Sequence, residues 1–349
     1  MKRRFFRTAA AFVAAVLFAI PTAAAPELSA ASAILMDADT GAVLYEKNAD
    51  CPSLIASTTK IMTAVVALEH CDPEESFTVP EAATQIEGSS VYLKAGETVT
   101  VRELLYGMML HSGNDAAVAL ALACSGSVEE FVAQMNLKAQ KLGLKNTHFE
   151  NPNGLDGETH RSSARDLALL TQYALQNEDF LAIVSTKTIR IGERCFSNHN
   201  KLLWTLDGAL GVKTGYTKAA GRVLVSAAER GGRRLIAVTV RDGNDWQDHR
   251  ALYDFGFSFY KPREIVGRGE CVGTLTAMDG SSADLRADSA LEYAAADGET
   301  PQIQILYPKL AFSVGAAGSY AGWACVYMGT RCIGKLRLVW GGVNREAAG

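Results

Sequence analysis

The sequence lacks the residue patterns of common metalloproteins and nucleic-acid-binding proteins. Its seven cysteines form no CxxC pair and its six histidines form no HExxH motif, which argues against a structural zinc site and a zinc peptidase. Only 21% of the 349 residues are charged, and the formal net charge of −4 leaves no basic surplus for nucleic acid. No internal repeat or low-complexity linker is present. With 48% apolar residues, the composition is that of a globular protein of one large or two ordinary domains.

The N-terminus has the pattern of a signal peptide. Residues 1–25 hold four basic residues and no acidic one, and an apolar run over 9–20 is followed by small residues. We therefore expect cleavage near Ala24 or Ala25. The alternative is an uncleaved anchor, for which the charge-free stretch 8–26 is barely long enough. No later segment approaches about 18 consecutive apolar residues, so the mature protein is expected to be exported, either free or held at a surface by something weaker than a spanning helix.

The cysteines leave their pairing open. An odd count means that at least one thiol is unpaired even in an oxidising compartment. Cys325 and Cys332 flank residues 326–331, which are typical of a hairpin turn. The two could bridge across that turn or remain separate buried thiols.

Apolar periodicity predicts an α+β fold, with strands at both ends of the first 260 residues and helices between them. The elements expected there are a hairpin over 31–47, helices over 57–70, 101–125 (broken at 111–113), 128–142 and 163–176, strands over 211–213, 223–228 and 235–241, and a helix over 246–257. We expect the N-terminal hairpin to join the late strands in one antiparallel sheet. Beyond Pro262 the expected elements are short strands over 271–275, 302–306, 323–328 and 335–340. The expected limits are a signal peptide over 1–25, a first domain over 26–261 and a small all-β domain over 262–349.

The first of three chemical motifs is Ser57-Thr58-Thr59-Lys60. It places Lys60 one turn after Ser57 at the start of a helix. A serine hydroxyl becomes a good nucleophile when a nearby base takes its proton, and a lysine whose pKa is lowered by burial and neighbouring cations is such a base. Alone the motif is weak, because serine is a routine N-cap and an SxxK occurs by chance about once in a chain of this length.

The second motif is Ser112-Gly113-Asn114, in the break between two apolar helices. A hydroxyl and an amide two residues apart can face one cavity, where Ser112 would relay a proton and Asn114 would bind a substrate amide. The competing interpretation is that Asn114 caps the following helix and Ser112 ends the preceding one.

The third motif is Lys213-Thr214-Gly215, at the end of an apolar strand. A strand edge can pair with an extended peptide. Lysine then offers a cation, threonine a hydroxyl for a carboxylate, and glycine a close approach of the two chains. The competing interpretation is a strand end followed by a glycine turn.

The order SxxK, SxN, KTG is that of class A β-lactamases and penicillin-binding proteins. The sequence most resembles the low-molecular-mass penicillin-binding proteins that are serine-type D-alanyl-D-alanine carboxypeptidases. Segments that carry the likeness are 57–63, 88–90, 104–110, 112–117, 151–155, 163–166 and 211–217. The resemblance covers about residues 28–260. It implies a β-lactamase/transpeptidase-like antiparallel sheet with a helical cluster, followed by the all-β domain.

The resemblance implies an enzyme that removes the terminal D-alanine from peptidoglycan stem peptides ending in D-Ala-D-Ala and that β-lactams acylate. Ser57 would be the nucleophile, Lys60 the general base and Ser112 the proton relay to the leaving amine. The residues implied in substrate binding are Asn114, Lys213, Thr214, Gly215 and Tyr216. Lys213 would also lower the pKa of Lys60, and the backbone N–H groups of Ser57 and Tyr216 would form the oxyanion hole. No metal or organic cofactor is implied.

The implied location is the extracellular face of the cell membrane, the cell wall or the periplasm. Membrane attachment is left open, because residues 341–349 are short and not amphipathic. Arg241 and Arg250 are both candidates for an arginine that binds the substrate carboxylate.

Three other functions use the same motifs or fold. A class A β-lactamase needs a glutamate that activates a deacylating water, and no loop of that kind is recognisable. A catalytically silent wall-binding or drug-sensing protein is disfavoured by the intact motifs. A peptidoglycan DD-endopeptidase or a transpeptidase uses the same nucleophile chemistry, and the sequence does not separate these from a carboxypeptidase.

Overall fold

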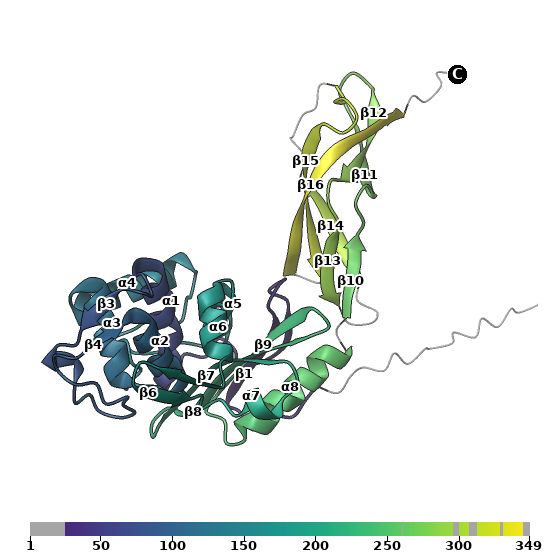
Figure 1. Ribbon diagram of the computed structural model, residues 1–349. Coiled ribbons are helices and arrows are strands. Elements are labelled where there is room, and N and C mark those ends of the chain that lie inside the picture. The colour runs from purple at the N-terminus through teal and green to yellow at the C-terminus, as the bar shows by residue number, and fades with distance from the viewer. Residues whose placement is uncertain (1–24, 260, 296–299, 307–312, 329–330, 345–349) are drawn as a thin grey trace, which may run out of the picture.

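A five-stranded antiparallel sheet organises residues 25–259 (Figure 1). Its strands, in spatial order, are β2 (Val43–Lys47), β1 (Ser32–Asp37), β9 (Arg233–Val240), β8 (Gly221–Arg230) and β7 (Ala209–Thr217). The N-terminal hairpin therefore joins the three late strands, as the sequence predicts. The computed structural model describes residues 25–259, 261–295, 300–306, 313–328 and 331–344. The expected signal peptide lies, except for Ala25, outside the described residues.

Both faces of the sheet are covered, because alternate residues of its central strands are apolar on both sides. In β1, Ile34 and Met36 point into one core cluster, while Ala33 and Leu35 point into the other. The helices packed in the first cluster are α1 (Lys60–His70), α2 (Val101–Leu110), α3 (Asn114–Ser125), α4 (Val128–Lys141), α5 (Ala164–Ala174) and α6 (Glu178–Ser185). The second cluster is closed by α7 (Leu202–Thr205) and α8 (Asp245–Phe259).

Side-chain caps fix where several of these helices begin. The side chains of Thr100, Ser127, Ser163 and Asn177 accept backbone N–H groups of the first turns of α2, α4, α5 and α6. Each such bond satisfies a backbone N–H group of the first helical turn, which has no acceptor within the helix itself. The expected break in residues 101–125 is confirmed, because α2 ends at Leu110 and α3 begins at Asn114.

Short elements connect the helices. They are the 3₁₀ turns η1 (Ala56–Thr59) and η2 (Glu81–Ala83), the hairpin of β3 (Ser76–Thr78) and β4 (Thr98–Thr100), and the hairpin of β5 (Thr188–Ile191) and β6 (Arg194–Ser197). A disulfide joins Cys71 to Cys124 and so ties the C-terminal ends of α1 and α3 together. Cys325 and Cys332 are free thiols, the first half-buried and the second exposed, so neither the bridge nor the pair of buried thiols considered for them is found.

The residues after α8 form a narrow lobe in which the described elements are all strands (Figure 1). They are β10 (Lys261–Val266), β11 (Cys271–Thr276), β12 (Ser282–Ala287), β13 (Leu291–Ala295), β14 (Pro301–Leu306), β15 (Tyr320–Met328) and β16 (Arg331–Asn344). Five of them form a sheet in the order β11-β12-β16-β15-β14, and β10 pairs with β13. This separate all-β domain is the one that the sequence predicts.

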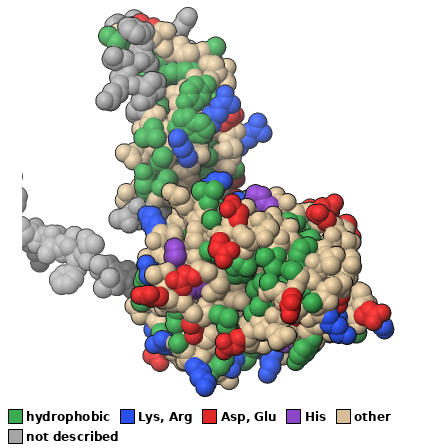
Figure 2. Space-filling model, turned by 90° about the vertical axis from the view of Figure 1, so that its left-hand side faces the viewer, with side chains coloured by type: hydrophobic (Ala, Val, Ile, Leu, Met, Phe, Trp, Pro, Cys, Tyr) green, Lys and Arg blue, Asp and Glu red, His purple; other side chains and the backbone are tan. Residues whose placement is uncertain are grey.

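Residues 25–259 form a broad lobe, which meets the narrow lobe through apolar side chains. Tyr293 of β13 is buried in the core cluster that contains Leu44 and Leu252 of the broad lobe, and Met328 and Ile333 pack against the same cluster. On the face shown in Figure 2, most acidic side chains lie on the broad lobe. No single helix in the described ranges is long and apolar enough to cross a membrane, and α3 and α4 pass that test only as a pair bent by 88°.

Candidate active site

Ser57 lies on η1, the tight turn that leads into α1, and is half-buried. Neither η1 nor α1 has a side-chain N-cap hydrogen bond, so Ser57 does not act as a cap. Ala56 has a φ of 47°, which non-glycine residues rarely adopt. Gly154 (φ 88°) backs this turn, and a Cβ at Gly154 would lie 2.1 Å from the Ala56 carbonyl oxygen. The nucleophile turn is thus supported from behind by a loop that only glycine permits.

Lys60, the first residue of α1, is completely buried directly beneath Ser57. Its Nζ lies 2.9 Å from Ser57 Oγ, 2.7 Å from Asn114 Oδ1 and within hydrogen-bond distance of the Asn153 carbonyl oxygen. A neutral amine has two N–H groups and one lone pair. Asn114 and Asn153 accept the two N–H groups, which leaves the lone pair facing the Ser57 hydroxyl. The geometry is therefore that of a base positioned to take the serine proton.

Burial and charge both favour the neutral form of this lysine. Burial is the largest effect and the positive charge of Lys213 the second, and together they hold the pKa of Lys60 well below its ordinary value, against the opposing effect of Asp115. Burial also lowers the pKa of Lys213 to about 7. The effect of Lys213 on Lys60 is the one that the family resemblance implies.

Lys213, on β7, holds Ser112 in the loop between α2 and α3. Its Nζ donates to Ser112 Oγ at 3.0 Å and to the Thr214 carbonyl oxygen at 3.1 Å. Ser112 itself has a φ of 66°, so the helix break turns its side chain out of the helical path and toward β7. The second and third motifs, 101 residues apart in sequence, are thereby joined by one hydrogen bond.

Asn114 does not cap α3, which overturns the competing interpretation of the second motif. It is the first residue of the helix, and Gly113 stands at the cap position without a side-chain hydrogen bond. The Asn114 amide instead connects two groups. Its Oδ1 accepts from Lys60, and its Nδ2 donates to the Glu87 carbonyl oxygen. The Asn114 backbone N–H donates to the Ser89 carbonyl oxygen at 2.7 Å, so the loop between η2 and β4 fixes this side chain.

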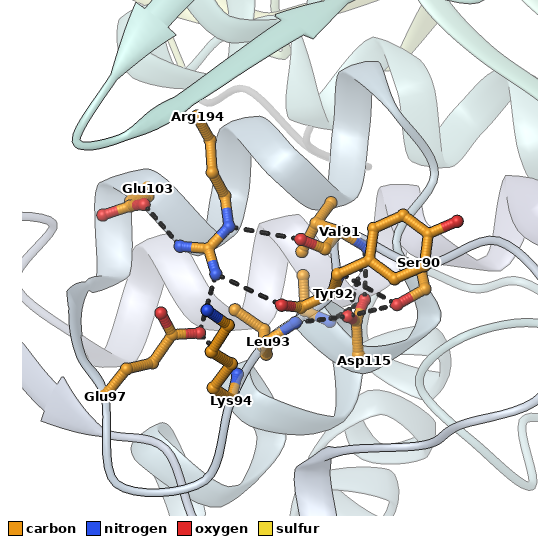
Figure 3. A network of polar contacts seen from close by, with 10 residues as sticks. Ser90, Val91, Tyr92, Leu93, Lys94, Glu97, Glu103, Asp115 and Arg194 are labelled. Atoms are coloured by element: carbon orange, nitrogen blue, oxygen red, sulfur yellow. Dashed lines mark hydrogen bonds and ion pairs between the residues drawn. The ribbon is translucent and has the colours of Figure 1, made fainter.

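The same loop is held by a carboxylate and a guanidinium (Figure 3). Asp115 accepts hydrogen bonds from Ser90 Oγ at 2.6 Å and from the backbone N–H groups of Val91 and Leu93 at 3.0 and 3.1 Å. From the other side, Arg194 of β6 donates to the Val91 carbonyl oxygen at 3.2 Å. Arg194 also forms ion pairs with Glu97 and Glu103 at 2.7 and 3.0 Å. These contacts fix the wall of the site that carries Ser89.

Residues of all three motifs border one cleft, which has a volume of about 610 Å³. Its lining residues are Ser57, Ser89, Ser112, His199, Thr214, Gly215, Tyr216, Arg222, Val223, Asp245 and Trp246. One wall is β7, the last strand of its sheet. Gly215 lets this strand approach the nucleophile turn, because a Cβ there would lie 3.0 Å from the Ile55 carbonyl oxygen and 3.2 Å from the Ser57 backbone nitrogen. Tyr216 is exposed at the rim.

The structure thus brings all eight residues singled out from the sequence into one place. Five of them line the cleft or its rim, whereas Lys60, Asn114 and Lys213 lie beneath it, linked to Ser57 or Ser112.

Arg222, Asp245 and Trp246 in the same cleft are not evident from the sequence. Arg222 is half-exposed, and Asp245 accepts two hydrogen bonds from its Nε and Nη2 at 2.9 and 2.7 Å. The guanidinium lies 5.7 Å from the Trp246 ring centroid. Arg222 stands opposite Tyr216 in the β7–β8 pairing, so the register of the sheet places it there, and the strand pattern is the one sequence signal that points to it.

The two arginines considered from the sequence lie elsewhere. Arg241 donates to the Ala219 carbonyl oxygen, Arg250 donates to the Thr205 carbonyl oxygen, and neither lines the cleft. His199 lines the cleft without any sequence motif that marks it. Burial and the charges of Lys213 and His111 lower the pKa of His199 to about 4, so it is neutral at neutral pH.

Comparison with protein families and curated proteins gives a consistent match. The D-alanyl-D-alanine carboxypeptidase family matches residues 20–244. The chain is 38% identical over 264 residues to D-alanyl-D-alanine carboxypeptidase DacF of Bacillus subtilis, which covers 72% of this chain and 68% of the relative. It is 36% identical over 301 residues to D-alanyl-D-alanine carboxypeptidase DacD of Escherichia coli, covering 81% and 77%.

Solved structures extend the similarity over both lobes. Penicillin binding protein 5 from Haemophilus influenzae superposes with a TM-score of 0.76 at 28% identity, covering 92% of this chain and 99% of that one. The Streptomyces K15 DD-transpeptidase superposes with a TM-score of 0.66 at 34% identity, covering 68% of this chain and 100% of that one.

Proposed function

The chain belongs to the D-alanyl-D-alanine carboxypeptidase family of serine peptidases, and on that basis we propose that the cleft is its active site, with Ser57 as the residue that is acylated. The chain is a serine-type carboxypeptidase that removes the terminal D-alanine from peptidoglycan stem peptides and binds penicillin. The residues of the cleft divide the steps of this reaction between them.

Acylation begins at the Ser57 hydroxyl. Its oxygen attacks the carbonyl carbon between the two D-alanines while its proton passes to the lone pair of Lys60 Nζ, 2.9 Å away. The carbonyl oxygen becomes an oxyanion that the backbone N–H groups of Ser57 and Tyr216 stabilise. In acyl-transfer enzymes one such donor contributes about 2.7–4 kcal/mol to transition-state stabilisation.

The leaving D-alanine needs a proton on its nitrogen. The proton held by Lys60 returns through the Ser112 hydroxyl, which Lys213 holds at 3.0 Å. The C–N bond then breaks, D-alanine leaves as an amine, and an ester remains on Ser57. In the second half, water attacks the ester carbon and gives its proton to Lys60. The acid leaves and Ser57 Oγ regains the proton, so the enzyme ends as it began.

The substrate is held by charge and by the strand edge. An extended stem peptide pairs with the free edge of β7, and the Asn114 amide meets the peptide side of the substrate. The Thr214 hydroxyl binds the terminal carboxylate in the positive potential of Lys213. Arg222 also lines the cleft, where its ion pair with Asp245 fixes the guanidinium and leaves its other N–H groups to the carboxylate.

The observation that carries these roles is the position of the completely buried Lys60 Nζ, 2.9 Å from Ser57 Oγ and 2.7 Å from Asn114 Oδ1. Intact-mass analysis after incubation with penicillin tests them. We expect one adduct per chain, located on Ser57 by peptide mapping and absent in Ser57→Ala. Ser89→Ala is the matched control, because Ser89 lines the same cleft without contacting Lys60, and it should keep the adduct. An adduct that persists in Ser57→Ala would overturn the assignment of the nucleophile.

The reaction on peptidoglycan is separated from its alternatives by product analysis. Stem pentapeptides and cross-linked dimers are incubated with the enzyme and analysed by mass spectrometry. Loss of one alanine from the pentapeptide is the expected result. Cleavage of the cross-link without that loss would mean an endopeptidase.

We also propose the limits and location of the parts. Residues 1–25 act as a signal peptide, residues 26–261 form the penicillin-binding domain and residues 262–349 the β domain. The mature enzyme works outside the cytoplasm, at the cell wall or in the periplasm. The basic, apolar leader sequence and the peptidoglycan substrate of the family support this location.

A further inference from the structure

The sheet of the narrow lobe has one buried face and one face that turns large apolar side chains toward solvent. Side chains alternate between the two faces along each strand. The residues of β14, β15 and β16 that pack in the core of the lobe include Ile303, Ile305, Ala324, Val326, Leu336 and Leu338. Leu306, Tyr320 and Trp323 lie on the opposite face, which we call the outer face, and are 42%, 52% and 37% exposed. Three of the nine large hydrophobic side chains that are exposed in the described residues are thus on this one face.

The three side chains adjoin one another. The ring centroids of Tyr320 and Trp323 are 6.4 Å apart, in an edge-to-face arrangement. Leu306 stands opposite Trp323 in the pairing of β14 with β15. Single exposed apolar side chains are common on soluble proteins, whereas a contiguous group of them marks an interaction surface. The outer face therefore has the composition of a binding surface.

Two cations stand over these rings. Lys335 Nζ is 4.9 Å from the Trp323 ring centroid, and the Arg337 guanidinium carbon is 5.7 Å from the Tyr320 ring centroid. Arg337 also pairs with Asp288 at 2.9 Å, whereas Lys335 is in no ion pair found among the residues that the structure describes. On the side shown in Figure 2, hydrophobic and basic side chains of the narrow lobe lie next to one another. The charge of Lys335 is therefore available to an anion that contacts the Trp323 ring.

Two side-chain amides lie beside the rings. Gln302 and Gln304 are exposed and share the outward-facing positions of β14 with Leu306. Gln304 stands opposite Cys325, which in turn stands opposite Lys335 on β16. Each amide offers two N–H donors and a carbonyl acceptor. The outer face thus combines aromatic rings, amides and a cation.

This combination fits an acidic polymer of acetamido sugars. The C–H groups on one face of a sugar ring pack against an aromatic ring, and the hydroxyl and N-acetyl groups exchange hydrogen bonds with side-chain amides. A carboxylate on the polymer is attracted to the lysine. A lipid surface is a poorer match, because the two glutamine amides would lose their hydrogen bonds with water among the acyl chains.

We propose that the outer face, centred on Trp323, binds the glycan strands of peptidoglycan. These strands are chains of acetamido sugars, and the peptides attached to them carry carboxylates. The identity of the polymer rests on the proposed function, but no residue of the outer face lines the cleft. The outer face belongs to the narrow lobe and the cleft to the broad lobe (Figure 1), so a strand on the outer face leaves the cleft open to a stem peptide.

Co-sedimentation with insoluble peptidoglycan sacculi tests the proposal. The mature chain is first acylated with penicillin, so that its cleft is closed to stem peptides, and intact mass confirms the adduct. We expect the acylated chain to sediment with the sacculi. The adduct tests the proposed function and the sedimentation tests the outer face, so the two can fail separately. An acylated chain that stays in the supernatant would overturn the proposal about the outer face.

Competition distinguishes sugars from peptides as the bound part. Glycan strands that an amidase has freed from their peptides keep all their sugars and gain a carboxylate on each lactyl group. They should therefore release the acylated chain from the sacculi. If only the freed peptides released it, the outer face would be a peptide site and the proposal would be wrong.

Variants locate the binding surface. Trp323→Ala should weaken binding to sacculi about tenfold, because it removes the ring on which a sugar packs. Lys335→Gln, a change at an exposed side chain, should weaken binding about threefold and make it less sensitive to salt. Trp204→Ala is the matched control, because Trp204 is 48% exposed on α7 of the broad lobe, and it should bind like wild type. Thermal unfolding checks that each variant is folded. Binding that is equal in wild type, Trp323→Ala and Lys335→Gln would overturn the assignment.

Vesicles test the lipid alternative. The same chains are floated with vesicles of phosphatidylglycerol and phosphatidylcholine. We expect no vesicle binding that depends on Trp323. Trp323-dependent binding to vesicles, without binding to sacculi, would overturn the proposal in favour of a lipid surface.

Discussion

Two buried lysines in one site divide the chemistry between them. Lys60 contacts the nucleophile and must lose its proton to act as a base, whereas Lys213 contacts Ser112 and acts through its charge. Both side chains are excluded from water, and no salt bridge in the described residues neutralises either one. Their separate roles make separate predictions.

Replacing each lysine by arginine distinguishes a residue that acts as a base from one that acts through its positive charge. Arginine stays protonated in proteins, so Lys60→Arg should lose about 10²–10⁴-fold in the rate of acylation by penicillin. Lys213→Arg keeps the charge that its role needs and should lose much less. The measurement is the acylation rate with a fluorescent penicillin, on variants whose circular dichroism matches wild type. Equal losses in the two variants would contradict the division of roles.

The lowered pKa of Lys213 also makes stability depend on pH. Its pKa is about 7 in the folded chain against an ordinary 10.5, so between these values the unfolded chain holds more protons. The free energy of unfolding should therefore rise with pH through this window, by up to about 1.4 kcal/mol per pH unit, and the cost of the buried lysine should be constant below about pH 7. Urea unfolding between about pH 7 and pH 10 measures the slope.

Lys213→Met is the reference for that slope, because it removes the titrating group and keeps an apolar stem. The wild-type curve should be steeper than that of the variant. Parallel curves would mean that Lys213 stays charged in the fold up to its ordinary pKa.

At the level of elements, the sequence predicts what depends on local pattern and misses what depends on register. The helices over 101–125 and the hairpin over 31–47 are predicted, because their apolar spacing and turn residues are strong. The helix α6 is only eight residues long, and the strands β5 and β6 have four residues each, so the sequence predicts none of them.

The site follows the same division. The three motifs contain the residues that meet at Ser57, and the family resemblance ties them together. Arg222 reaches the cleft because it stands opposite Tyr216 across β7 and β8. The support of Asn114 by Glu87 and Ser89 depends on how a loop folds over α3. Long-range packing decides both, and no local pattern encodes it.

Gly154 gives a prediction for the element that carries the nucleophile. An alanine there would place its Cβ 2.1 Å from the Ala56 carbonyl oxygen, so the turn before Ser57 must move. Gly154→Ala should therefore slow penicillin acylation more than tenfold. Gly143→Ala is the matched control, because Gly143 also has a positive φ (70°) but nothing lies within 4 Å of its Cβ position. The control should cost about 1 kcal/mol of stability and leave acylation unchanged. Acylation rates that match in the two variants would show that the turn does not depend on Gly154.

At the level of the whole molecule, the narrow lobe contributes packing but no described residue of the cleft. The cleft residues all precede Asp248, whereas Tyr293, Met328 and Ile333 cover apolar surface of the broad lobe. A chain that ends at Lys261 should therefore acylate with penicillin within tenfold of the full-length rate but unfold at a lower temperature. Stopped-flow acylation and thermal unfolding measure the two effects. A folded truncation that acylates more than tenfold slower, about 1.4 kcal/mol in barrier, would mean that the β domain shapes the site.

The long strand β16 sets the distance between the broad lobe and the far tip of the narrow lobe. It begins near the broad lobe, where Ile333 packs against the shared cluster, and ends at Asn344 toward the far tip of the narrow lobe (Figure 1). Its 14 residues span roughly 45 Å. A binding partner at that tip would hold the cleft at a fixed stand-off, so the enzyme would trim peptides in one layer of a meshwork and leave those nearer the attachment point untouched. The length of β16 would then determine how far from the attachment point the enzyme trims peptides.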